Sequence, residues 1–182
     1  EKISGTYFSI TFDDGFKNCL TNACEIMLKY QCKGAFFVLT DFIGLHFESN
    51  QKELIQFYHN STNGNPVEFL TWEDCQEIKN MGMTIGSHTT NHAHLIDQSE
   101  ETLMHIFSES KQKIEVNLGV PCEHFACTWG IPGKDFIVGR ENKLIEEIGY
   151  KDFLTTLRGA NKAGTDPFFI RRDHVLANWE IF

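Results

Sequence analysis

Apolar residues along this chain follow two spacings, one typical of strands and one typical of helices. The continuous apolar run at 34–39 (GAFFVL) predicts a strand buried on both faces. Further strands are expected at 7–12, 83–87, 124–128, 151–156 and 168–171. Helical spacing predicts helices at 18–30, 72–80, 100–118 and 135–148. This regular order of strand and helix predicts an α/β domain with a parallel sheet covered by helices, either open or closed into a barrel.

Polar caps and glycines mark the ends of two of these helices. Thr71, with Asp74 three positions later, forms a variant of the capping box, and Gly82 ends the same helix. Ser99 begins the next helix and Gly119 stops it. Local chemistry alone therefore predicts where both helices begin and end.

One segment, residues 44–68, interrupts the alternation between a strand and the helix that follows Thr71. It contains the turn-rich stretch 60–66 (NSTNGNP) and a candidate short helix at 53–58. Long insertions in compact domains often form lids or binding loops, and others are plain surface excursions. The sequence leaves both interpretations of this insertion open.

The composition is that of an ordinary folded domain of 182 residues, 41% hydrophobic and 23% charged. No apolar run approaches the roughly 18 residues that a membrane-spanning helix needs, so no membrane span is expected. The chain carries 16 basic and 25 acidic residues, with no basic cluster. Nucleic acid is therefore not an expected partner, because binding a phosphate backbone requires clustered Lys and Arg. A neutral or amine-bearing substrate fits the net charge of −9 better.

Six cysteines are spread along the chain, at Cys19, Cys24, Cys32, Cys75, Cys122 and Cys127. They form no CxxC pair, so a thiolate zinc site is not expected. A domain of this size needs no disulfide framework, and we interpret the cysteines as reduced, mostly buried thiols. This interpretation favours a cytoplasmic location. A secreted or periplasmic location stays open, because a chain that begins at Glu1 is compatible with a removed signal peptide.

The strongest local signal is the motif TFDDG at 11–15, in which two carboxylates stand where a strand ends and a glycine permits a sharp turn. Sites in α/β sheets form at the carboxyl ends of strands. One carboxylate can ligate a metal there while the other serves as a base. An acidic surface turn is the alternative, because Asp-Gly is common in turns.

The second signal is SHTTNH at 87–92, in which His88 and His92 lie four positions apart after a predicted strand. A helical turn or a tight loop would bring both imidazoles within reach of one metal. A zincin helix does not fit, because Thr89 stands where that motif has Glu. We expect His94 to be a rim residue and not a ligand.

The two signals together are more specific than either alone. One carboxylate and two histidines from the ends of two strands would form a facial triad, with open positions for water and substrate. The second carboxylate is what a hydrolytic water needs as a general base. A structural zinc site is disfavoured, because such sites fill all four positions, mostly with Cys and His.

With these motifs the chain resembles the NodB-like polysaccharide deacetylases, carbohydrate esterase family four. The similar sequence motifs are TFDDG (11–15), GAFFV (34–38), LTWE (70–73) and GSHTTNH (86–92). The resemblance covers nearly the whole chain and implies a distorted (β/α) barrel, with one catalytic domain over residues 1–182. Because domains of the family often continue with a further helix, a truncated C-terminus is expected.

The resemblance also implies roles for five residues. By the family's pattern Asp13 is the catalytic base, and Asp14, His88 and His92 bind one divalent metal ion. That ion is expected to be Zn²⁺, with Co²⁺ or Ni²⁺ as substitutes. Thr89 is expected to hydrogen-bond within the histidine loop and brace it.

The third motif of the family is altered here. The stretch FACTWG at 125–130 departs from the Arg-Pro-Pro-aromatic motif of the best-known branch and resembles the Phe-Ala-Tyr-Pro-aromatic-Gly branch. Trp129 then stands at the aromatic position, with its N–H as the candidate oxyanion donor and its ring as a wall facing the sugar. A core tryptophan is the alternative. Arg172 is the candidate to orient Asp13, with Arg171 in its place if the register slips by one.

His174 is the candidate general acid, with a structural histidine as the alternative.

The expected function is that of a metal-dependent hydrolase that removes N-acetyl groups from an amino sugar in a poly- or oligosaccharide and releases acetate. Its rivals are an O-acetyl esterase or another amide hydrolase on the same fold, and a relative that binds a glycan without catalysis. The expected partner is an N-acetylated glycan or glycoconjugate, and the oligomeric state stays open.

Overall fold

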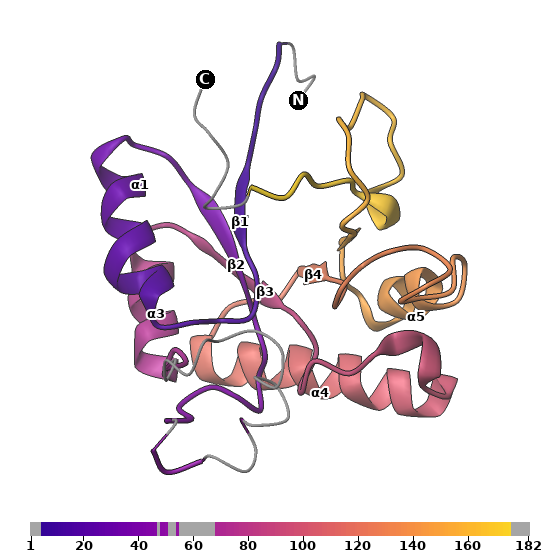
Figure 1. Ribbon diagram of the computed structural model, residues 1–182, viewed down its shortest axis with the longest axis horizontal. Helices are drawn as coiled ribbons and strands as arrows, with labels where there is room; N and C mark the ends of the chain where they lie inside the picture. The colour runs from indigo at the N-terminus through magenta and orange to yellow at the C-terminus, as the bar shows by residue number, and fades with distance from the viewer. Residues whose placement is uncertain (1–4, 47, 51–53, 55–67, 176–182) are drawn as a thin grey trace. The chain divides into compact units, whose positions relative to one another are not determined.

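The computed structural model describes residues 5–46, 48–50, 54 and 68–175 (Figure 1). The chain divides into two compact units, one formed by Glu1–Val38 with Phe42–Ile85 and the other by Leu39–Asp41 with Gly86–Phe182. The sheet order of the strands is β1-β2-β3-β4-β5, which is also their order along the chain. Each strand is thus followed in the sheet by the next strand of the sequence, an order compatible with the predicted alternation of strand and helix.

The first unit contains a parallel pair of strands. β1 (Ile10–Phe12) pairs with β2 (Gly34–Val38) in a register that sets Ile10 opposite Gly34. A glycine is needed there, because a Cβ at this position would lie 2.9 Å from the carbonyl oxygen of Ile10. Both strands lie inside the segments predicted from the sequence, although β1 is three residues long and shorter than expected.

Helical segments accompany this pair. The predicted helix at 18–30 forms as a π-helical turn, η1 (Cys19–Cys24), that continues into α1 (Glu25–Lys29). α3 (Trp72–Asn80) begins with the predicted capping box, in which Thr71 Oγ1 accepts the Asp74 N–H at 3.2 Å and the Asp74 carboxylate accepts the Thr71 N–H at 2.8 Å. η1 contacts α3, and Figure 1 shows the two helices of this unit together at the left.

The remaining three strands also pair in parallel. β3 (Thr84–Ser87) pairs in parallel with β4 (His124–Ala126), and β4 pairs in parallel with β5 (Asp152–Leu154). Ser87 lies opposite Phe125 in this register. All three strands fall within their predicted segments, and polar residues of the sequence motifs follow β3 and β4 directly.

The long predicted helix is confirmed as α4 (Glu100–Leu118). Its N-cap is Ser99, whose side chain accepts the Thr102 N–H at 3.2 Å, and Gly119 ends it in the left-handed conformation at φ 66°. One face of α4 packs into a buried aromatic cluster formed by Phe107, Phe125, Phe136, Tyr150 and Phe153. This cluster joins α4 to the middle of β4 and of β5 and therefore packs these elements together.

The helix predicted at 135–148 is wrong at its beginning, because α5 covers only Glu141–Ile148. The carboxylate of Asp135 turns back to accept the Ile131 N–H at 2.8 Å, which forms a turn where the pattern suggested a helix. Gly139 then takes φ 87°, a conformation incompatible with a right-handed helix. The helical spacing of apolar residues continues through this turn, so the sequence pattern did not reveal that the helix begins only at Glu141.

The strand predicted at 168–171 is also wrong. Pro167–Phe169 forms a short 3-10 helix, η3, and the Asp166 carboxylate caps it by accepting the Phe168 N–H at 2.9 Å. Only an isolated parallel bridge between Leu154 and Ile170 preserves strand-like pairing there. A proline at the first turn and an aspartate before it favour a helix start over a strand.

All six cysteines are unpaired and five of them are buried, as expected from their spacing.

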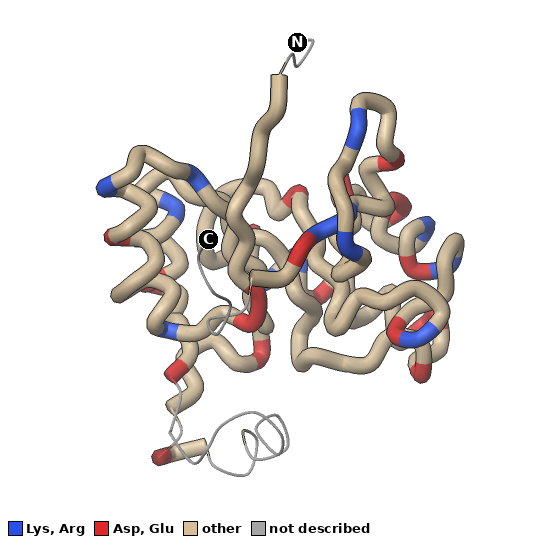
Figure 2. Tube along the Cα trace, turned by 45° about the horizontal axis from the view of Figure 1, so that its top comes forward, with Lys and Arg blue, Asp and Glu red and all other residues tan. Residues whose placement is uncertain are grey.

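Most of the insertion at 44–68 lies outside the described residues, so its role as a lid or a surface excursion stays a prediction. Among the described residues, no helix combines the length and apolar character that crossing a membrane requires. Lys and Arg positions are interspersed with Asp and Glu positions along the tube in Figure 2, in agreement with the absence of a basic cluster from the sequence.

Candidate metal and catalytic site

The acidic motif forms a tight turn directly after β1. Asp13 follows the last residue of the strand, Asp14 has φ 73° and Gly15 has φ 77°. The turn is anchored by the Leu70 N–H, which donates to the Gly15 carbonyl at 2.9 Å. A Cβ at Gly15 would approach the Val38 side chain to 3.3 Å, so glycine suits this close approach. Both carboxylates therefore stand at the carboxyl end of a strand, as predicted.

His88 comes directly after β3 and is buried, with 2% of its surface exposed. Its Nδ1 lies 2.7 Å from the carbonyl oxygen of Ala126, which follows Phe125 in β4. A carbonyl can only accept a hydrogen bond, so Nδ1 carries the proton, and in the neutral imidazole Nε2 carries the lone pair. Metal-binding histidines are typically oriented in this way, by a hydrogen bond from the other ring nitrogen.

The histidine motif folds as a tight loop and not as a helical turn. Thr89 and His92 both have positive φ, at 73° and 59°. Thr89 Oγ1 accepts the His92 N–H at 3.0 Å, which confirms the predicted brace. The ring centroids of His88 and His92 are 5.2 Å apart, with an angle of 63° between the ring planes. The loop thus brings the two imidazoles together as the four-residue spacing predicted.

A buried residue that the sequence analysis missed supports this loop from α4. Ser110 Oγ donates to the Thr89 carbonyl at 3.2 Å and lies 2.7 Å from Ser87 Oγ, which in turn accepts the Thr89 N–H at 3.3 Å. All three residues are completely buried. The only signal in the sequence was a serine on the otherwise apolar face of the helix, which by itself does not indicate a partner.

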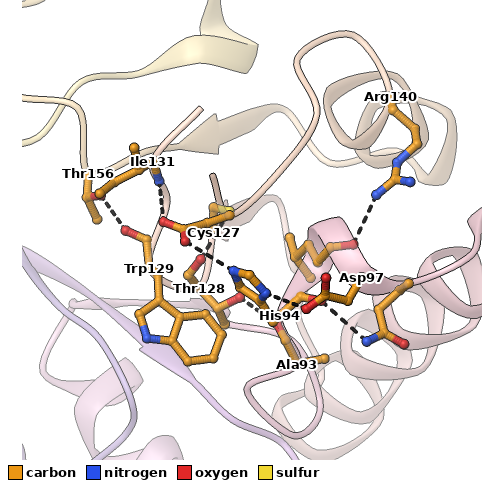
Figure 3. A network of polar contacts seen from close by, with 12 residues as sticks. Ala93, His94, Asp97, Cys127, Thr128, Trp129, Ile131, Arg140 and Thr156 are labelled. Atoms are coloured by element: carbon orange, nitrogen blue, oxygen red, sulfur yellow. Dashed lines mark hydrogen bonds and ion pairs between the residues drawn. The ribbon is translucent and has the colours of Figure 1, made fainter. Parts of the chain in front are cut away.

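Trp129 lies against the histidine loop. Its ring centroid is 4.3 Å from that of His92, in edge-to-face geometry. It is 5.1 Å from that of His94, also edge to face (Figure 3). The residue is 48% exposed, so the alternative of a core tryptophan is wrong. No described residue accepts a hydrogen bond from the Trp129 backbone N–H. The position is therefore compatible with both predicted roles, a wall for the substrate and an oxyanion donor.

The loop that carries Trp129 is held by Thr156, which lies after β5 in the sequence. Thr156 Oγ1 donates to the Trp129 carbonyl, and the Thr156 N–H donates to the Gly130 carbonyl at 3.1 Å. Gly130 has φ 75°, and a Cβ there would lie only 2.7 Å from the Thr156 nitrogen. Glycine after the aromatic residue is therefore a steric requirement of this loop.

Left-handed backbone is concentrated in the three motifs. Among the described residues five that are not glycine have positive φ, and four of them are Asp14, Thr89, His92 and Trp129. Such conformations cost of order 1–3 kcal/mol each and persist where the surrounding structure enforces them, most often at functional sites. The motif residues are thus held in unfavourable backbone geometry by the contacts described above.

His94 lies at the rim, as predicted, and both of its ring nitrogens are occupied. Nδ1 lies 2.6 Å from a carboxylate oxygen of Asp97, and Nε2 lies 3.1 Å from a carboxylate oxygen of Asp135 (Figure 3). The hydrogen bond to Asp97, followed by that to Asp135, raises the pKa of His94 above its usual value, against the opposing effect of burial. A histidine held in this way has no nitrogen to offer a metal.

The candidate arginines and the candidate general acid, which follow β5 in the sequence, lie in different environments. Arg172 is half-buried beyond the end of β5, where its Nε donates to the Thr155 carbonyl at 2.9 Å. Arg171 is exposed, and its guanidinium donates to the Arg158 carbonyl at 3.2 Å. His174 is exposed. The pairing of Arg172 with Asp13 and the acid role of His174 stay predictions.

The chain belongs to the polysaccharide deacetylase family, whose pattern matches residues 2–151. This match contains both the acidic motif and the histidine motif, and it ends one residue before β5. No curated protein matches the chain significantly. The family assignment confirms the resemblance on which the site residues were predicted.

Solved structures show the same fold. The chain is similar to IcaB from Ammonifex degensii, with a TM-score of 0.78 and 20% identity over 96% of this chain and 70% of that one. It is also similar to the Streptococcus pyogenes deacetylase PplD in complex with acetate, with a TM-score of 0.73 and 22% identity over 93% and 65% of the two chains. The predicted distorted (β/α) barrel is thereby confirmed.

A third similar structure is BA3943 from Bacillus anthracis, a pseudoenzyme of the CE4 family, with a TM-score of 0.58 and 14% identity over 82% of this chain and 43% of that one. The chain thus spans between 43% and 70% of the length of these three proteins. Since the fold occurs both in a deacetylase and in a pseudoenzyme, activity has to be argued from the site.

Proposed function

We propose that this chain is a metal-dependent hydrolase that removes N-acetyl groups from an amino sugar in a poly- or oligosaccharide and releases acetate. The observation that carries this proposal is the orientation of His88. Its Nδ1–H is committed to the Ala126 carbonyl at 2.7 Å, so the lone pair of a buried imidazole is presented on Nε2. Membership of the polysaccharide deacetylase family supports an acetylated carbohydrate as the substrate.

The proposed metal ligands are Asp14, His88 and His92, the group of metal-ligating side chains that the described residues offer. Two imidazole nitrogens and one carboxylate oxygen suit Zn²⁺, and Co²⁺ or Ni²⁺ would be accepted by the same donors. A divalent ion bound by three protein ligands supplies a Lewis acid with open positions for water and the acetyl oxygen.

The remaining roles fall to groups of the chain itself. Asp13 is the proposed base that takes a proton from the attacking water, and Arg172 is proposed to orient its carboxylate. The Trp129 N–H is the proposed donor to the oxyanion of the tetrahedral intermediate. His174 is the proposed acid that protonates the departing sugar nitrogen. Proton gain by Asp13 and proton loss by His174 balance the hydrolysis.

The test is acetate release from a panel of N-acetylated and O-acetylated oligosaccharides, using metal-stripped protein with and without added zinc or cobalt. We expect metal-dependent release from an N-acetylated member of the panel. Preferential release from the O-acetylated members would replace the proposal by the esterase alternative. Stoichiometric metal binding without release from any member would contradict catalysis and favour a glycan-binding relative.

The Asp13→Asn variant separates the base from the ligands. It should lower kcat by about 10²–10⁴-fold, because it removes a general base, while the zinc content stays at the wild-type level. Asp41→Asn is a matched control, because Asp41 pairs with Lys113 at 2.6 Å and has no proposed role in catalysis. Activity of Asp13→Asn equal to that of the control would refute the assignment of the base.

A further inference from the structure

His94 has no role in the reaction proposed above, yet it is tied to two carboxylates. Its Nδ1 and Nε2 lie 2.6 Å from Asp97 and 3.1 Å from Asp135. Both distances are within hydrogen-bonding range, so each ring nitrogen is paired with one carboxylate. Figure 3 shows the imidazole bonded to Asp97, and its ring centroid lies 5.1 Å from that of Trp129.

Asp135 is the centre of this arrangement. It is 2% exposed, and its second carboxylate oxygen accepts the Ile131 N–H at 2.8 Å. Its main-chain carbonyl accepts the Ile96 N–H at 2.9 Å. One buried residue thus binds the chain just after the histidine loop, through His94 and Ile96, and the chain just after Trp129, through Ile131.

Two further contacts join the same pair of loops. Thr128 Oγ1 donates to the Ala93 carbonyl at 2.7 Å, immediately beside the metal-ligand candidate His92. The Trp129 ring packs on His92 and His94 together. The connection is therefore built from hydrogen bonds on both sides of the aromatic contact, and every member belongs to the same compact unit.

We propose that His94 and Asp135 are positioning residues that hold the oxyanion donor Trp129 in register with the metal ligand His92. The inference rests on the proposed function, in which these two residues act on the same acetyl group. Its physical basis is rigidity, because hydrogen-bond donors stabilise a transition state only when they are already in place. A shift of either loop would separate the two groups without removing either one.

The test is the His94→Phe variant of the full chain. Phenylalanine keeps an aromatic ring beside Trp129 and removes both hydrogen bonds, which leaves Asp135 without its histidine partner. We expect kcat to fall by about 10–100-fold, as outer-shell changes at metal sites do, with KM and the zinc content near those of the wild type. The absorption spectrum of the cobalt-loaded variant should shift, because it reports the geometry at His92. A wild-type kcat and an unchanged cobalt spectrum would overturn the proposal.

The matched control is His124→Phe. His124 makes the same type of bond, with Nδ1 2.6 Å from the Asp152 carboxylate, at the amino-terminal ends of β4 and β5. Its loss should leave kcat and the cobalt spectrum unchanged. Equal losses in His94→Phe and His124→Phe would show a general effect of breaking a His–Asp pair and would overturn the positioning role.

A readout without metal or substrate keeps this inference separate from the proposed function. The chain has three tryptophans, so in a protein with Trp72→Phe and Trp179→Phe the fluorescence of Trp129 reports the loop alone. Adding His94→Phe should increase quenching of Trp129 by acrylamide, because the loop loses the hydrogen bond between His94 and Asp135. Unchanged quenching would overturn the positioning role even if the wild type released no acetate. Increased quenching in an inactive wild type would support it while the proposed deacetylation fails.

Discussion

The Nδ1 atom of His88 lies 2.7 Å from the carbonyl oxygen of Ala126. This contact follows from the register of two parallel strands. β3 and β4 set Ser87 opposite Phe125, which brings His88, the residue after β3, alongside Ala126, the last residue of β4. Strand pairing thereby places a hydrogen-bond acceptor beside Nδ1, so Nε2 is the ring nitrogen that the proposed metal would use. A residue of the neighbouring strand contributes only its backbone to this arrangement, so its side chain gives no sign of the role.

Replacing His88 by Gln should abolish zinc binding, because the variant loses a ligand nitrogen in a buried position. Metal analysis of the purified protein and the thermal shift on adding zinc measure this loss. His105→Ala is the matched control, since the side chain of His105 is 75% exposed on α4 and pairs only loosely with Glu109 at 3.3 Å. Zinc content in His88→Gln equal to that of the control would remove His88 from the ligand set.

Thr89→Val should destabilise the histidine loop by about 0.5–1.5 kcal/mol, because the part-buried His92 N–H loses its acceptor. Valine is also branched at Cβ, so the backbone strain at φ 73° changes little. Thr89→Ser keeps the hydroxyl and should restore most of the stability and zinc affinity. Urea unfolding of the metal-free proteins compares the two, and equal stability would show that the hydrogen bond is unimportant.

Gly130→Ala should be markedly more destabilising than Gly133→Ala. Both glycines have φ near 75°, so both variants carry the cost of about 1–2 kcal/mol for a left-handed alanine. At Gly133 no atom lies within 4 Å of the added Cβ, whereas at Gly130 the Thr156 nitrogen lies at 2.7 Å. That overlap should add about 1–3 kcal/mol and displace Trp129. Equal free energies of unfolding for the two variants would contradict the close approach.

His124→Gln should cost more stability at about pH 6 than at about pH 9. The hydrogen bond to Asp152 raises the pKa of His124 above its ordinary 6.5, with Glu123 acting in the same direction and burial and Lys151 opposing it. A raised pKa in the folded state means that the stabilisation is complete below the unfolded value and is lost as pH rises through the folded value. Thermal midpoints of the wild type and the variant across this range measure the difference, and a constant gap would refute it.

The sequence predicted best those features that depend on neighbours within a few residues. The capping box of Thr71 and Asp74 and the left-handed Gly119 formed as expected, because cap hydrogen bonds close within one helical turn. The brace from Thr89 to His92 is of the same kind. Hydrophobic spacing failed at 135–140, since it cannot register a turn made by one aspartate.

The identity of the motif residues was readable from the sequence, because two carboxylates and two histidines at strand ends are chemically distinctive. The contacts that hold these residues in place could not be predicted from the sequence. Ser110 meets Thr89 across 21 residues, Ala126 meets His88 across 38, and Asp135 meets His94 across 41.

The sequence by itself therefore determined the family motifs, which helix caps form and which class of fold results. Only the tertiary structure decided the tautomer of His88, the exposure of Trp129 and the link from His94 to Asp135. Local geometry follows from residue type over a few positions, whereas these contacts depend on strand register and helix packing, which are properties of the whole folded chain.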